Sequence, residues 1–145
     1  MDIRPFQPQD RSQVIALWNE VFAYPEPHND PAESIRRKLA VKDDLFLVAV
    51  EDSKVLGTAM GGYDGHRGWV YSLAVDPEHR RKGIGTALMR SLEEKLESLG
   101  CPKLNLQVLN HNLGVVAFYE SLGYKVEERT SMGKRFVTDK QGSSR

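Results

Sequence analysis

The chain has 145 residues, with 20 basic and 20 acidic side chains and a formal net charge of zero. This balance argues against a general nucleic-acid binder, which usually carries a basic excess. No apolar run approaches the ~20 residues that span a membrane, and the N-terminus lacks an apolar signal-peptide core. Cys101 is the only cysteine, so no intrachain disulfide is possible. We expect one cytoplasmic domain over residues 1–140, with a flexible tail at 141–145.

The first half of the chain is predicted to contain two helices and several strands. One helix opens at Pro8 and carries an apolar stripe that ends near Phe22. A second helix has Asp30 as its N-cap and Pro31 at its first position, and it runs to about Val41. Strands are expected at 3–6, 45–50, 55–63 and 69–75, with the last three joined by turns.

The second half is dominated by one strongly amphipathic helix. Leucines recur at helical spacing from Ile84 to Leu99, and Gly100 is a natural stop. A strand at 104–108, a helix over 115–122 and two final strands at 124–129 and 134–137 follow. Alternating helices and strands with hairpins predict an α/β domain built on a mixed sheet. Four scattered histidines and one cysteine show no metal-ligand spacing, so no metal is expected.

The most informative segment joins the strand at 69–75 to the long helix. It reads Arg80-Arg81-Lys82-Gly83-Ile84-Gly85. Glycines let a backbone approach a ligand closely, and the first amides of a helix have no partner inside it. These free amides, the positive end of the helix dipole and three cations together predict a phosphate site.

The spacing narrows the kind of phosphate site. A P-loop would need Gly-Lys-Ser/Thr, which is absent, and a dinucleotide fingerprint would need a small residue where Leu88 stands. Arg80-x-x-Gly83-x-Gly85 instead resembles the acyl-CoA-binding motif of the GNAT family of N-acetyltransferases. Asn112-x-x-x-x-Ala117-x-Tyr119-x-x-x-Gly123-Tyr124 resembles a second motif of that family. Residues 55–75 are also similar to its uncharacterised bacterial YpeA-type subgroup.

The resemblance implies a sheet whose two central strands splay apart to admit acetyl-CoA as cosubstrate. The backbone of Leu73, Ala74 and Val75 would pair with the pantetheine arm. The pyrophosphate would lie on amides of Arg81, Lys82, Gly83, Ile84, Gly85 and Thr86. Arg80 and Lys82 would contact the nucleotide phosphates, worth ~1 kcal/mol each if exposed. Asn112 would face the pantetheine or the thioester, and Tyr119 would be the general acid.

Two questions about the chemistry stay open at this level. Tyr119 shares an apolar stripe with Phe118, so core packing competes with the catalytic role. The family's strand glutamate is replaced by Trp69, which cannot act as a base. The remaining alternatives are a water chain to bulk solvent or one of four loop residues, namely Glu26, His28, Asp64 and His66.

The acceptor is expected to be the amine of a small molecule, peptide or protein. Loops at 24–30 and 63–69 are the candidates for recognising it. Trp69 and Tyr71 either wall the acceptor pocket or pack against a helix, and packing is favoured. A homodimer would require a free apolar strand edge. Two other functions compete: a non-catalytic acyl-CoA-binding domain of the same fold, and a nucleotide-binding module.

Overall fold

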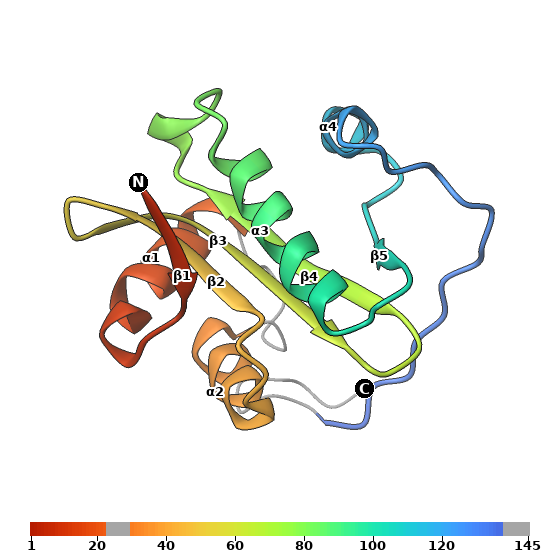
Figure 1. Cartoon of the computed structure of the whole chain (residues 1–145), viewed down its shortest axis with the longest axis horizontal. Helices are drawn as coiled ribbons and strands as arrows, with labels where there is room; N and C mark the ends of the chain where they lie inside the picture. The colour runs from red at the N-terminus through yellow and green to blue at the C-terminus, as the bar shows by residue number, and fades with distance from the viewer. Residues whose placement is uncertain (23–29, 138–145) are drawn as a thin grey trace.

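The computed structural model describes residues 1–22 and 30–137, which form one mixed sheet with helices on both faces (Figure 1). In chain order the elements are β1 Asp2–Pro5, the 3-10 turn Pro8–Asp10, α1 Arg11–Phe22, α2 Pro31–Val41, β2 Phe46–Glu51, β3 Lys54–Tyr63, β4 Gly68–Val75, the 3-10 turn Pro77–His79, α3 Ile84–Ser98, β5 Leu104–Leu106 and α4 Leu113–Ser121. The strand order in the sheet is β1-β2-β3-β4-β5; neighbouring strands are antiparallel except for the parallel pair β4 and β5.

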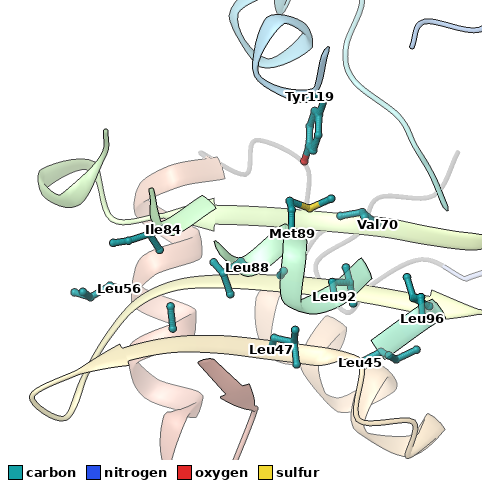
Figure 2. Packing of buried hydrophobic residues seen from close by; sticks show 12 residues of the cluster. Leu45, Leu47, Leu56, Val70, Ile84, Leu88, Met89, Leu92, Leu96 and Tyr119 are labelled. Carbon is teal, nitrogen blue, oxygen red and sulfur yellow. The ribbon is translucent and has the colours of Figure 1, made fainter. Parts of the chain in front are cut away.

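Two apolar clusters sandwich the sheet. On one face α3 packs Leu88, Leu92 and Leu96 against the strands, as Figure 2 shows. On the other face α1 and α2 bury Trp18 and Ile35 against β2, β3 and β4. The indole Nε1 of Trp18 donates a 2.9 Å hydrogen bond to the Thr58 hydroxyl, so that buried polar pair is satisfied. Every strand residue therefore faces either the α3 side or the α1–α2 side.

The two central strands separate where cofactor entry is expected. β5 pairs only with Gly68–Val70, whereas β4 continues to Val75 along β3. The register shifts at this point, because Met60 opposes Ser72 while Gly61 opposes Val70, so Tyr71 is the extra residue of a β-bulge. The stretch from Tyr71 to Val75 thus has β3 on one side and no β5 partner on the other. The expected splayed mixed sheet is confirmed.

Most predicted boundaries agree with the structure. Asp30 is the N-cap of α2, its carboxylate accepts from the Ala32 amide, and the helix ends at Val41. Gly100 has a φ of +85° just beyond α3, a conformation that glycine adopts without steric cost. The first helix is a partial exception, because Pro8–Asp10 forms a 3-10 turn and α1 proper begins at Arg11.

The predicted strands at 124–129 and 134–137 are wrong, and β5 ends at Leu106 rather than at residue 108. Residues 124–137 have no regular structure, and Val126, Met132 and Phe136 are exposed. A strand forms only where a sheet edge can receive it, and β5 offers an edge of three residues. Among the described residues, only side-chain hydrogen bonds link this segment to β5 and its flanks: Lys103 and Asn105 bond to Glu127, and Gln107 bonds to Ser131.

An ion pair beside the sheet leads to a prediction about stability and pH. The guanidinium of Arg4 donates to both oxygens of the buried Asp10 carboxylate, at 2.8 and 3.0 Å, and the Gln7 amide donates at 2.8 Å. The hydrogen bond from Arg4 is the main reason why the pKa of Asp10 lies below its usual value. This stabilisation is complete above the unfolded-state pKa of about 4 and is lost as pH falls through the lower folded-state pKa.

Asp10→Asn is therefore expected to lower the free energy of unfolding at neutral pH by about 1–3 kcal/mol. The difference from the original chain should shrink as the pH falls below about 4, because the carboxylate is then protonated. Urea unfolding at several pH values measures both effects. Asp52→Asn, in the exposed turn between β2 and β3, is the control. Equal stability of the two variants at neutral pH would contradict a stabilising role for the pair.

Candidate active site

The N-terminus of α3 is open to an anion. Gly83 is its N-cap, with a φ of +79° and no side-chain hydrogen bond to the first turn. The amides of Ile84, Gly85 and Thr86 are among the first of the helix and have no partner within it. A left-handed N-cap without a side chain leaves these amides accessible, and the helix dipole makes them favourable for negative charge.

The basic loop in front of α3 is held by the turn that ends β4. Asp76 caps this turn by accepting from the Glu78 amide at 3.0 Å, and its own amide donates to the Leu56 carbonyl. The Glu78 amide, followed by Lys54 and His79, keeps the pKa of the Asp76 carboxyl below its usual value. Beyond the turn, Arg80, Arg81 and Lys82 are all exposed. The loop therefore places three solvated cations next to the free helix amides.

The β4 segment expected to hold the cofactor lies beside this loop. Leu73, Ala74 and Val75 pair with Ala59, Thr58 and Gly57 of β3. β5 pairs with β4 only as far as Val70, so the backbone groups of these three residues that point away from β3 have no hydrogen-bond partner in any described strand. Such groups can accept an extended ligand by strand-like hydrogen bonds.

The second motif approaches the same end of α3. A Cβ on Gly85 would lie 3.3 Å from the Phe118 ring and 3.7 Å from Val75, so α4 touches the first turn of α3. Asn112 is the exposed N-cap of α4, and its side-chain oxygen Oδ1 accepts a 3.3 Å hydrogen bond from the Val115 amide. The structure therefore gives Asn112 a capping role, and its predicted contact with the cofactor stays a prediction.

Tyr119 is buried next to α3. Its ring packs edge-on against Phe118 and Tyr124, with centroids 5.1 and 5.7 Å apart. Figure 2 shows the hydroxyl directed toward Met89 of α3. Burial raises the pKa of Tyr119 to about 12, so the phenol stays protonated at neutral pH. The residue belongs to the core cluster and is also a protonated donor, so its two alternative roles are compatible.

The candidate bases gain no support from the described residues. Asp64 accepts from the amides of His66 and Arg67, both at 2.8 Å, and these bonds hold the pKa of its carboxyl below the usual value. It is therefore a charged turn residue. His66 is exposed, whereas Glu26 and His28 lie outside the described residues. Within 1–22 and 30–137, no three His, Cys, Asp or Glu side chains converge as metal ligands.

The β-bulge is the feature that sequence reasoning missed. Because of it, the Tyr71 ring lies over Gly62, where a Cβ would approach the ring to 3.2 Å. Tyr71 is 64% exposed, so the favoured expectation that it packs against a helix is wrong. Trp69 lies on the same face and is partly buried. The signal for the bulge in the sequence was Gly62 within the neighbouring strand, since a glycine inside a strand often marks a bulge or a close approach of another group.

Comparisons with known proteins agree with this geometry. Residues 11–124 match the family model described as "Acetyltransferase (GNAT) family". A Yersinia pestis protein named acetyltransferase is 44% identical over 141 residues, covering 97% of this chain and 99% of that protein. Among the described residues, no helix has the length and apolar character needed to cross a membrane.

Solved structures show the same fold at low sequence identity. An aminoglycoside 6'-N-acetyltransferase of Acinetobacter haemolyticus superposes with a TM-score of 0.77 at 20% identity, covering 94% of this chain and 99% of that one. The PaiA N-acetyltransferase of Thermoplasma acidophilum, solved in complex with coenzyme A, has a TM-score of 0.71 at 23% identity, covering 89% and 92%. These similarities do not test the bacterial subgroup, which stays a prediction.

Proposed function

The chain belongs to the GNAT family of acetyltransferases, and from this membership we propose that it is an acetyl-CoA-dependent enzyme that acetylates a primary amine by direct transfer. The observation that carries the proposal is the uncapped N-terminus of α3 next to the unpaired end of β4. The first feature suits a pyrophosphate and the second suits a pantetheine arm. The complex of the related PaiA protein with coenzyme A supports this choice of cosubstrate.

The proposed reaction needs few side chains. The neutral amine attacks the thioester carbonyl, a C–N bond forms, and the C–S bond breaks to release the coenzyme A thiolate. Main-chain amides on the side of β4 that has no β5 partner would stabilise the developing oxyanion. Tyr119 donates a hydrogen bond to the departing sulfur, and the proton lost by the amine passes to water. The products are the N-acetyl amine and coenzyme A.

A thiol-release assay over a panel of small amines and peptides tests this function, together with thermal shifts measured with acetyl-CoA, coenzyme A, ATP and NAD. We expect stabilisation by the two coenzyme A compounds and turnover with at least one amine. Stabilisation by ATP or NAD but not by coenzyme A would overturn the cofactor assignment. Tight binding of acetyl-CoA without turnover of any acceptor would overturn the enzymatic assignment.

Arg80→Ala and Lys82→Ala are each expected to weaken acetyl-CoA binding by up to about fivefold. Both side chains are exposed, and an exposed charge contact is worth at most about 1 kcal/mol. Because salt screens such contacts, the loss should shrink at high ionic strength. Isothermal titration at low and high salt measures it, and Arg129→Ala, which removes an exposed arginine elsewhere, is the control. Undiminished affinity at low salt would exclude these cations from the cofactor site.

A further inference from the structure

The expected position of the thioester follows from the order of the two cofactor contacts. The first turn of α3 lies against the end of β4, since a Cβ on Gly85 would come within 3.7 Å of Val75. A pyrophosphate on that turn would direct its pantetheine arm back along the unpaired edge of β4, from Val75 toward Tyr71. β5 occupies that edge at Gly68–Val70. Under the proposed function, the thioester therefore lies beside the β-bulge at Tyr71.

The acceptor amine is expected on the face of the sheet that carries α1 and α2. Tyr119, which is proposed to donate to the departing sulfur, belongs to the cluster on the α3 face. Tyr71 lies on the opposite face, because its ring covers Gly62 and the same glycine adjoins Lys38 of α2. Tyr71 is thus an aromatic residue on the acceptor side, at the point where the arm of the cofactor ends.

The Tyr71 ring is supported from below and open to solvent. A Cβ at Gly62 would lie 3.2 Å from its Cε2 atom, so the ring rests closely on the backbone of β3. The residue is nevertheless 64% exposed, so a large part of its surface is accessible to a ligand. The face of an aromatic ring attracts cations, most strongly where the ring is fixed and water is partly displaced. The exposed ring is therefore suited to an ammonium group.

Two carboxylates act on the Tyr71 hydroxyl. Burial, followed by the negative charges of Asp64 and Asp43, raises the pKa of this phenol, so the side chain is neutral at neutral pH. Asp43 accepts a 2.7 Å hydrogen bond from Lys38, whose side chain is only 9% exposed. This ion pair is closed, because the lysine balances the aspartate. Asp43 therefore contributes little net charge at the ring.

Asp64 is the carboxylate that leaves a net negative charge beside the ring. Its side chain accepts only from the neutral backbone amides of His66 and Arg67, both at 2.8 Å. The Arg67 guanidinium donates to the His66 carbonyl and forms no ion pair with Asp64. Asp64 is exposed, so its charge is available to a ligand that lies on the Tyr71 ring. An exposed aromatic face next to an unbalanced carboxylate favours a cation over a neutral or anionic group.

We propose that Tyr71 is the specificity-determining side chain of the acceptor site, and that it selects amines that carry a second positive charge. The reacting amine lies at the bulge beside the thioester, and the second ammonium group lies on the Tyr71 ring near Asp64. The acceptor class is therefore a short diamine, or a larger molecule with two neighbouring amino groups. This inference rests on the proposed acetyl transfer and names its substrate class.

The test compares 1,4-diaminobutane, 1-aminobutane and 4-aminobutanoate as acceptors at saturating acetyl-CoA. These amines have similar chains that end in a cation, a neutral group and an anion. We expect kcat/KM for the diamine to be about tenfold above that for the monoamine, beyond the statistical advantage of two equivalent amines, and the anionic amine to be the poorest. Equal use of all three by the unmodified chain would overturn the inference.

Tyr71→Ala should lower kcat/KM for the diamine to near the monoamine value, with the affinity for acetyl-CoA unchanged. Tyr71→Phe keeps the ring and should keep the preference. Asp64→Asn should reduce the preference about threefold, since asparagine can accept the same turn hydrogen bonds without the charge. A preference that survives in Tyr71→Ala, or a fall in this variant that is equal for all three amines, would overturn the role in specificity.

Matched controls remove similar groups elsewhere. Phe136→Ala takes away an aromatic side chain that is 89% exposed, and Asp52→Asn takes away a carboxylate in another exposed turn. Neither should change the preference among the three amines. A loss of preference in either control equal to that in the Tyr71 or Asp64 variants would overturn the assignment. Absence of thiol release with every amine would instead overturn the proposed function.

Discussion

Replacing Tyr119 with phenylalanine is expected to lower kcat by roughly a hundredfold while leaving the affinity for acetyl-CoA unchanged. The ring contacts with Phe118 and Tyr124 are kept in this variant, so the core around α4 should remain intact. Only the hydroxyl directed toward α3 is removed. If that hydroxyl stabilises the departing thiolate, its loss affects the transition state and not the ground-state complex.

The environment of Tyr119 indicates how the hydroxyl acts. Burial raises its pKa to about 12, whereas a free thiol has a pKa near ~8.5. Complete proton transfer to the thiolate would therefore be uphill by roughly 5 kcal/mol. A hydrogen bond donated to the sulfur carries no such cost, and solvent can then supply the proton. We accordingly expect no fall in kcat from ionisation of Tyr119 below about pH 10.

The steady-state rate of thiol release at saturating substrates measures kcat, and isothermal titration measures the affinity for acetyl-CoA. Tyr124→Phe is the control, because it removes a neighbouring, partly buried hydroxyl that bonds to Glu93 and lies outside the proposed chemistry. We expect this control to lose stability but to keep its kcat. An unchanged kcat in Tyr119→Phe would leave Tyr119 with its packing role alone.

Local signals in the sequence predicted most of the framework. The leucine spacing located α3, and Asp30 with Pro31 located the start of α2, because capping and amphipathic periodicity act within a few residues. The glycines at 83 and 85 predicted the loop for the same reason. Such features depend on neighbours along the chain, so one sequence contains enough information to place them.

Features that depend on contacts between distant segments could not be predicted in the same way. The apolar run at 69–75 reads as one regular strand, and nothing in it marks Tyr71 as a bulge residue; that depends on the register with β3. The alternation at 124–129 predicted a strand, but a strand forms only where an edge can receive it, and β5 offers three residues. The capping role of Asn112 likewise became visible only with α4 in place.

Gly57→Val should destabilise the protein by about 2 kcal/mol and lower its melting temperature by about 4–8 °C. Intrinsic preference suggests the opposite, since valine favours strands and glycine weakens them. The structure reverses this expectation. A Cβ at Gly57 would lie 2.9 Å from the backbone carbonyl of Ala74, 3.0 Å from Leu88 and 3.1 Å from Ile84. A backbone carbonyl cannot swing aside as a flexible side chain can.

The same variant links the packing of α3 to the proposed cofactor site. Ala74 belongs to the free stretch of β4 and Ile84 opens α3, so a side chain wedged between them should push apart the two groups expected to hold acetyl-CoA. We therefore expect weaker acetyl-CoA binding as well as lower stability, measured by isothermal titration below the unfolding transition. Gly133→Val, where no atom lies within 4 Å of the added Cβ, should change neither. If Gly57→Val lost stability but bound acetyl-CoA normally, the close approach of α3 to β3 would serve the core without positioning the site.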